Sequence, residues 1–99
     1  AYASSKAALV QLTRSTAAEL GPHDINVNAV APGITATAMT RVLGDAEALQ
    51  QAASSGPLEN LFHRVSQPED VAAAITFLCL PGSRQITGQT IHTSAGAVV

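Results

Sequence analysis

Residues 2–33 read YASSKAALVQLTRSTAAELGPHDINVNAVAPG, and this stretch decides the fold. Apolar residues recur at helical spacing from 3 to 20, and the alanines among them spread apolar character onto several faces. This pattern predicts a helix that is buried on more than one side. Gly21 and Pro22 end it, because glycine favours the C-terminal cap and proline cannot continue the ladder. Residues 25–30 then alternate apolar and asparagine side chains, which predicts a strand that residues 31–33 end sharply.

The remainder of the chain predicts two more helices. Residues 34–65 are the least regular part, although 45–53 can form a helix that the Ser-Ser-Gly-Pro of 54–57 ends. Another helix opens after residue 65, where Ser66 and Glu69 can cap each other's backbone donors. Pro81-Gly82 ends it, and its predicted buried stripe consists of Val71, Ala74, Ile75 and Leu78.

A second strand is predicted over residues 87–93. The element order is therefore helix, strand, short helix, helix, strand, with no internal repeat. Two strands that are joined through a crossover helix pair in parallel within one sheet. The predicted fold class is accordingly α/β.

Composition excludes several classes of protein. The net charge of −2 comes without a basic run, which argues against nucleic acid and anionic membranes as partners. No apolar stretch reaches the roughly 18 residues that a membrane span needs, and no signal peptide is visible. Cys79 is the single cysteine and cannot form an internal disulfide, so a reducing, cytoplasmic location is expected.

The 99 residues also look like part of something larger. The chain is apolar and alanine-rich with few aromatic residues, so it has much small apolar surface to bury. It starts at Ala1, without Met, inside a predicted helix. We therefore expect an inner part of a larger domain, or an oligomer subunit, whose natural N-terminus is absent.

Tyr2 and Lys6 form the candidate catalytic pair. Residues four apart lie on one helix face, about 6 Å apart along the axis, so an ammonium can sit beside a phenol. A nearby cation and the helix N-terminus both favour the phenolate, which lowers the tyrosine pKa toward neutrality and makes a usable general acid/base. Tyr-x-x-x-Lys also arises by chance, so an ordinary helix with a surface lysine is the alternative.

Several ordered motifs together are more specific than this pair. They are Tyr2-Ala-Ser-Ser-Lys6, Glu19-Leu20-Gly21-Pro22, Val27-Asn28-Ala29-Val30-Ala31-Pro32-Gly33, Pro68-Glu69-Asp70-Val71-Ala72 and Ile86-Thr87-Gly88-Gln89-Thr90. In this order and spacing the chain resembles the short-chain dehydrogenase/reductase family over nearly its whole length. The nearest-looking subgroup is 3-oxoacyl-[acyl-carrier-protein] reductase-like.

The resemblance implies the C-terminal half of a single Rossmann-like, doubly wound parallel-sheet domain over residues 1–99. Residues 34–65 would include the variable substrate loop, and the N-terminal cofactor-binding half would be absent. The implied cofactor is NAD or NADP, and the implied reaction moves hydride between nicotinamide and a carbonyl or secondary alcohol. A homodimer or homotetramer is implied for the full-length parent.

The resemblance also assigns roles to single residues. Tyr2 would be the catalytic acid/base, and Lys6 would bind the nicotinamide ribose and lower the Tyr2 pKa. Pro32 and Gly33 would shape the turn at the nicotinamide. The backbone of Thr35 would meet the carboxamide, and Thr37 would contact the carboxamide or the pyrophosphate.

The chain departs from the family pattern in some places. The catalytic serine, its assisting asparagine and the glycine-rich phosphate turn lie upstream and are missing. Ser94-Ala95-Gly96 stands where Asp-Gly-Gly is common, so the C-terminal turn geometry is in doubt.

Other polar residues favour structural readings. The three histidines, His23, His63 and His92, lack metal-ligand spacing and are predicted to lie in loops or at the surface. Cys79 is predicted to be a buried thiol, and Asn28 to bond to neighbouring backbone. Met39 could line the substrate entrance or simply pack. Asp70 is predicted to cap or pair near its helix start.

Two rival functions stay open. One is a non-enzymatic oligomerisation module, to which the Ala/Leu faces of the first helix are suited. The other is a cofactor-binding sensor that has lost catalysis. The 99 residues alone are expected to be inactive, because the serine and the phosphate turn are missing.

Overall fold

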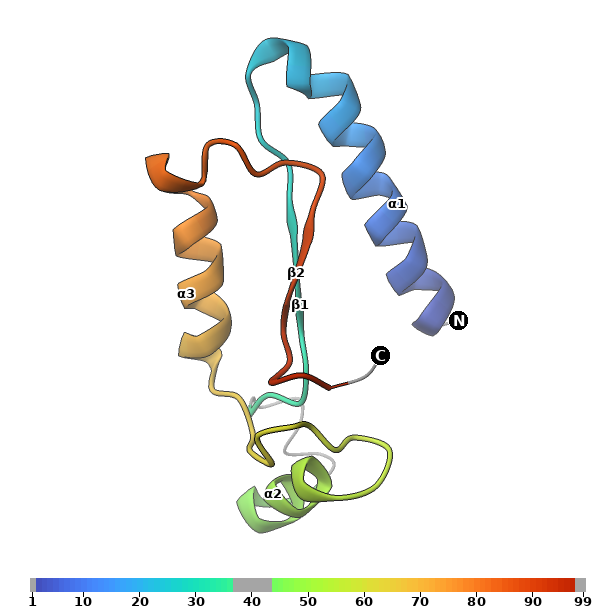
Figure 1. The fold of residues 1–99 in the computed structure, drawn as a ribbon. Coiled ribbons are helices and arrows are strands. Elements are labelled where there is room, and N and C mark those ends of the chain that lie inside the picture. The colour runs from blue at the N-terminus through green and yellow to red at the C-terminus, as the bar shows by residue number, and fades with distance from the viewer. Residues whose placement is uncertain (1, 37–43, 98–99) are drawn as a thin grey trace. The chain divides into compact units, whose positions relative to one another are not determined.

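In the computed structural model, residues 2–36 and 44–97 are described. The chain forms two compact units. The first comprises residues 1–30 and 75–91, and the second comprises residues 31–74 and 92–99, so the boundary passes through both strands. Figure 1 follows the chain through its elements, and each unit is described by itself below.

The first helix, α1, spans Tyr2–Leu20 and is followed by a 3-10 turn, η1, over Gly21–His23. The predicted helix and its Gly-Pro end are confirmed. One side of α1 is buried, at Thr13 and Ala17, while Leu9 and Leu12 are more than half exposed. Burial on several sides was therefore the wrong expectation for this unit by itself. A Cβ on Gly88 would lie 3.5 Å from the Ala17 Cβ, in ordinary van der Waals contact. The buried side of α1 therefore packs against the turn at Gly88.

The strands β1, Ala29–Pro32, and β2, Thr90–Thr93, form a two-stranded parallel sheet (Figure 1). The N–H of Ala29 donates to Gln89 O at 2.9 Å, and that of Gly33 donates to Thr93 O at 3.5 Å. Because alternate residues of a strand face the same neighbour, the missing N–H of Pro32 falls on the edge away from β2. A proline is therefore tolerated inside β1.

The predicted first strand, 25–30, starts four residues before the observed strand and ends two residues before it. Asn26 Nδ2 donates to Arg84 O at 2.8 Å and to Ile86 O at 2.7 Å. Asn28 Nδ2 donates to Ile86 O, and Asn28 Oδ1 accepts from Gln89 N. These side-chain bonds tie residues 26–28 to the turn before β2, and regular pairing starts only at Ala29. The structural role predicted for Asn28 is confirmed.

The second helix, α2, spans Ala46–Ser54, and the predicted short helix is confirmed. Asp45 caps it, because the N–H of Ala48 donates to Asp45 Oδ1 at 2.9 Å. Ser55 ends the helix in an extended conformation, and its N–H donates to Gln51 O. Leu49 and Ala53 are buried, and they are the apolar core that α2 contributes to the second unit.

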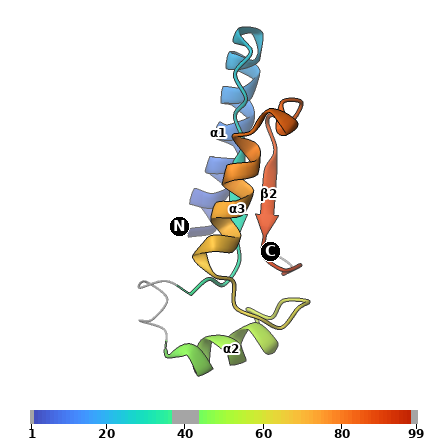
Figure 2. The ribbon, with the colours of Figure 1, turned by 90° about the vertical axis from the view of Figure 1, so that its left-hand side faces the viewer.

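The third helix, α3, spans Pro68–Leu78 and begins as a capped helix, but the predicted capping pair is wrong. The N–H of Gln67 donates to Asp70 Oδ2 at 2.7 Å, so Asp70 caps instead of Glu69. Ser66 forms a parallel β-bridge with Thr35. It lies two residues before Pro68, the first residue of α3, and so one residue before the N-cap position. Figure 2 shows the chain running from α2 through residues 55–67 into the start of α3.

The predicted buried stripe of α3 is not formed. No residue of the helix is buried, and Ile75 is 49% exposed. Cys79 is exposed, which corrects the prediction of a buried thiol. A short 3-10 turn, η3, follows at Pro81–Ser83 and precedes β2. The apolar side chains of α3 lack, within the described residues, the neighbours that would bury them.

The turn after β2 carries local strain. Ala95 has φ +53°, a left-handed conformation that costs a non-glycine residue about 1–2 kcal/mol. Ala95→Gly is expected to stabilise the protein by about 0.5–1 kcal/mol, because relief of this strain exceeds the entropy that glycine adds to the unfolded chain. Urea unfolding measures the effect. Ala97→Gly, at a position without positive φ, serves as the control and is expected to destabilise slightly. An Ala95→Gly protein less stable than the parent would contradict the strain argument.

Candidate active site

Tyr2 and Lys6 lie in the first two turns of α1. Lys6 is exposed, and the four-residue spacing places both residues on one face of the helix. The side chain of Tyr2 lies outside the described residues, so the contact between phenol and ammonium stays a prediction. The helix predicted to carry the pair is present and starts at Tyr2 itself.

Pro32 and Gly33 end β1 within the second unit. A Cβ on residue 33 would lie 3.0 Å from both the Cα and the Cβ of Ser94, and 3.4 Å from Ser94 O. Such distances are too short for any residue larger than glycine unless the backbone moves. Gly33 therefore lets the chain after β1 approach the chain after β2, a local reason for glycine beside the role that the resemblance implies.

Thr35 is buried, and its neighbours are fixed by a parallel bridge to Ser66. The N–H of Ser66 donates to Ile34 O at 3.0 Å, and the N–H of Ala36 donates to Ser66 O at 2.9 Å. The Thr35 hydroxyl donates to Gly33 O at 3.0 Å. The turn that follows Pro32 is thus held by its own strand end and by the entry to α3. Thr37 and Met39 lie outside the described residues.

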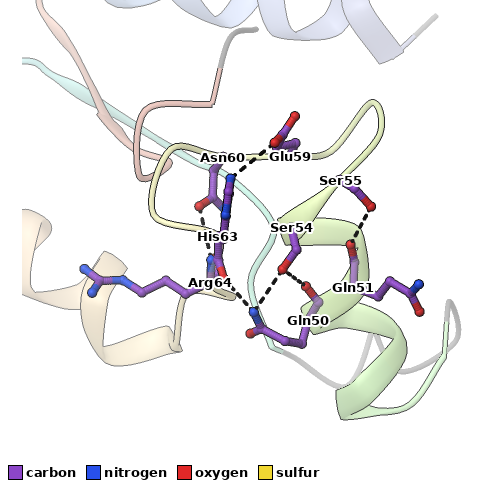
Figure 3. Close-up of polar contacts among 8 residues, drawn as sticks. All are labelled: Gln50, Gln51, Ser54, Ser55, Glu59, Asn60, His63 and Arg64. Atoms are coloured by element: carbon purple, nitrogen blue, oxygen red, sulfur yellow. Dashed lines mark hydrogen bonds and ion pairs between the residues drawn. The ribbon is translucent and has the colours of Figure 1, made fainter.

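Asn60 was missed by the sequence reasoning, although it is 4% exposed. Figure 3 shows its side chain closing the loop onto Arg64: Asn60 Nδ2 donates to Arg64 O at 2.7 Å, and Arg64 N donates to Asn60 Oδ1 at 3.2 Å. The N–H of Asn60 donates to Ala53 O at the end of α2. The side-chain amide of Asn60 therefore closes the 60–64 loop, and its backbone N–H ties that loop to α2. No motif or periodicity marks it in the sequence.

The same loop carries a second set of polar contacts (Figure 3). His63 Nε2 lies 3.2 Å from Glu59 Oε1, with both side chains more than half exposed. Gln50 Nε2 donates to His63 O at 2.5 Å and to the Ser54 hydroxyl at 3.2 Å. His63 itself has φ +51°. These contacts hold the backbone of the loop against α2, while the exposed ion pair adds little stability.

All three histidines, which are possible metal ligands, belong to the described residues. His23, His63 and His92 are exposed, as the sequence predicted, although His92 belongs to β2. Within residues 2–36 and 44–97, no three His, Cys, Asp or Glu side chains gather as metal ligands. Over the same residues, no helix has both the length and the hydropathy needed to cross a membrane.

A family model described as enoyl-(acyl carrier protein) reductase matches residues 1–98. The chain belongs to the short-chain dehydrogenase/reductase family. The family predicted from the ordered motifs is therefore confirmed, and so is the α/β, Rossmann-like fold class.

Curated relatives of this dehydrogenase/reductase chain include reductases from several organisms. The short-chain reductase protein NovJ of Streptomyces niveus is 39% identical over 100 residues, covering 96% of this chain and 37% of NovJ. The 3-oxoacyl-[acyl-carrier-protein] reductase of Aquifex aeolicus is 42% identical over 95 residues, covering 96% of this chain and 36% of that enzyme. The chain thus spans little more than a third of the relatives it matches.

Solved structures of the family superpose over most of the chain. A 4-hydroxyisoleucine dehydrogenase complexed with NADH is 30% identical, with a TM-score of 0.87 over 98% of this chain and 39% of its own. The NADPH-dependent reductase YwfH, involved in bacilysin biosynthesis, is 32% identical with a TM-score of 0.79, covering 93% of this chain and 37% of its own. At these identities the likeness extends beyond the fold to the family.

Proposed function

We propose that this chain supplies the acid/base half of the active site of an NAD(P)-dependent oxidoreductase. The full-length parent would transfer hydride between nicotinamide and a carbonyl or secondary-alcohol carbon. The observation that carries the proposal is the Tyr2-to-Lys6 spacing on the first turns of α1, in a chain whose family model matches 98 residues. Relatives that are 3-oxoacyl-[acyl-carrier-protein] reductases support a 3-oxoacyl thioester as substrate.

The residues present fit a nicotinamide nucleotide. Lys6 is exposed on α1, which suits an ammonium that meets ribose hydroxyls, and Gly33 carries no side chain beside the strand end. Hydrogen bonds to Thr93 and Ser66 hold the backbone on either side of Thr35, which suits a turn that meets a carboxamide. Thr37 completes the proposed cofactor-binding set of Tyr2, Lys6, Pro32, Gly33, Thr35 and Thr37.

In the proposed mechanism each residue of the site has a defined role. The nicotinamide, when bound, supplies or accepts the hydride. In reduction the Tyr2 hydroxyl donates its proton to the substrate oxygen, and in oxidation the Tyr2 phenolate removes the hydroxyl proton. Lys6 lowers the Tyr2 pKa by stabilising the phenolate, and it orients the ribose. Pro32, Gly33 and Thr35 shape the turn beside the ring. An upstream serine of the parent would position the substrate oxygen.

In this proposal the chain is one part of a longer parent protein. Residues 1–99 would be the C-terminal part of one Rossmann-like domain, with the variable substrate loop within 34–65. The parent would lie in the cytoplasm, a location that suits a single unpaired cysteine. Exposed Leu9 and Leu12 on α1 would be covered by a second subunit in a homodimer or homotetramer.

A non-catalytic module remains the second candidate. The same exposed Leu9 and Leu12 suit an assembly surface, whether or not the parent performs chemistry. An oligomerisation module, or a cofactor sensor with lost catalysis, would keep this surface and show no turnover. Turnover by the parent therefore separates the two candidates.

Residues 1–99 alone are expected to show no activity, whereas the full-length parent is expected to oxidise NADH or NADPH in the presence of a 3-oxoacyl thioester. The physical reason is that Tyr2 needs a bound cofactor and a positioned substrate oxygen, and the chain holds only part of both sites. The loss of reduced nicotinamide absorbance measures both. Hydride transfer by the purified 99 residues would contradict the division proposed here.

A further inference from the structure

A cavity of about 300 Å³ lies within the second unit, between α2 and the chain that leads to α3. It reaches Ala36, one residue beyond the proposed carboxamide contact at Thr35. Its lining residues are Ala36, Ala46, Leu49, Gln50, Arg64, Val65 and Gln67. A space of this size suits one end of a small molecule. The cavity joins the proposed cofactor turn to the predicted substrate loop.

Among the described residues that line the cavity, Arg64 is the one ionisable residue, and the other polar side chains, Gln50 and Gln67, are neutral amides. The Arg64 guanidinium lies 4.7 Å from the centre of the Phe62 ring. Stacking on an aromatic face orients a guanidinium without neutralising it. Among the described residues, no carboxylate forms an ion pair with Arg64.

Three acidic side chains of neighbouring segments are engaged elsewhere. Asp45 caps α2, Asp70 caps α3, and Glu59 pairs with His63. An arginine that lines a cavity and forms no ion pair with a described residue offers planar paired donors that match a carboxylate or a phosphate. The positive charge among the described lining residues therefore favours an anion.

The backbone of Arg64 is held before any ligand binds. Buried Asn60 donates to the Arg64 C=O and accepts from the Arg64 N–H, and Gln50 donates to the neighbouring His63 carbonyl (Figure 3). Ordering that is already present in the free protein is not lost again on binding. The backbone of Arg64 is thus held in place, and the Phe62 ring orients its exposed side chain.

We propose that this cavity receives an anionic group of the substrate, a carboxylate or a phosphate, and that the Arg64 guanidinium binds it. The proposal rests on the proposed function and adds the substrate class: a carbonyl compound that carries a negative charge away from the reacting carbon. A 3-oxoacyl thioester on a phosphorylated pantetheine arm and a keto acid are the two sources of such a charge.

The test in the full-length protein compares a charged and a neutral thioester. Arg64→Gln is expected to raise KM for acetoacetyl-coenzyme A about tenfold, the loss expected for a charge-assisted hydrogen bond, with kcat little changed. KM for neutral acetoacetyl-N-acetylcysteamine is expected to stay the same. Arg84→Gln, at an exposed arginine of the first unit, is the matched control and should change neither. An equal change for both thioesters, or none for the charged one, would overturn the proposal.

A binding measurement separates this proposal from the proposed function. Calorimetry of the full-length protein with pantetheine 4′-phosphate and with succinate distinguishes a phosphate from a carboxylate ligand and needs no turnover. Tighter binding of either anion to the parent than to the Arg64→Gln variant would support the proposal even if no thioester were reduced. Equal binding of both anions to the two proteins would overturn it even if thioesters were turned over.

Discussion

Tyr2→Phe in the full-length protein is expected to reduce kcat by about 10²–10⁴-fold while the fold is kept. The substitution removes only the hydroxyl that would exchange a proton with the substrate oxygen. The aromatic ring is retained, so neither stability nor assembly should change. Steady-state turnover, the thermal unfolding midpoint and the oligomeric state are the three measurements.

The control for this variant removes a hydroxyl from the same helix at a distance from the predicted site. Ser15 is exposed on α1, and the one hydrogen bond of its hydroxyl among the described residues is accepted from Gln11 Nε2 at 3.2 Å. Ser15→Ala should therefore leave turnover unchanged. If Tyr2→Phe kept normal turnover, Tyr2 would not be the acid/base, and the assembly module would become the better account.

Gly33→Ala has the second large expected effect, a destabilisation of about 1–3 kcal/mol, the usual range for overpacking a tight site. The added Cβ would lie 3.0 Å from the Ser94 Cα, so the backbone after one strand must move away from the backbone after the other. Because the same turn is proposed to shape the nicotinamide site, cofactor binding should weaken as well. Urea unfolding without cofactor and a direct cofactor titration measure the two effects separately.

Gly82→Ala is the matched control for Gly33→Ala. A Cβ on residue 82 would meet no atom within 4 Å, and no positive φ is recorded there. This substitution should be close to neutral for both stability and cofactor binding. A Gly33→Ala protein as stable as the Gly82→Ala protein would show that the approach to Ser94 imposes no requirement for glycine.

Helix ends were predictable because the signals that set them are local. Gly21-Pro22 ends α1, and Asp45 caps α2 from a position adjacent to the helix itself. The start of β1 was not predictable in this way. It depends on bonds from Asn26 and Asn28 to residues 58 to 61 positions later in the chain, which no local pattern reveals.

Burial was predicted less well than secondary structure. The apolar stripe of α3 and the thiol of Cys79 look like core in the sequence, yet no residue of the stripe is buried and Cys79 is exposed. Hydrophobic periodicity shows which face of a helix is meant to be covered, but it does not show whether the covering residues belong to the same 99 positions.

The candidate site, too, could be predicted only in part from the sequence. The residues of the proposed cofactor turn could be named from motifs, because the family pattern places Pro32 and Gly33 at fixed spacing from the helix that starts at Tyr2. Asn60 and Arg64 could not be named, because their significance comes from a loop closure that brings a buried amide against a backbone four residues on. Such a contact exists only in the folded chain, and no local sequence pattern indicates it.

A structure of the full-length protein with bound NAD or NADP tests the central claim most directly. The account predicts the Tyr2 hydroxyl and the Lys6 ammonium together on the nicotinamide ribose, with the Pro32-Gly33 turn beside the ring. A nucleotide bound elsewhere, with the phenol and the ammonium turned to different sides of α1, would contradict it.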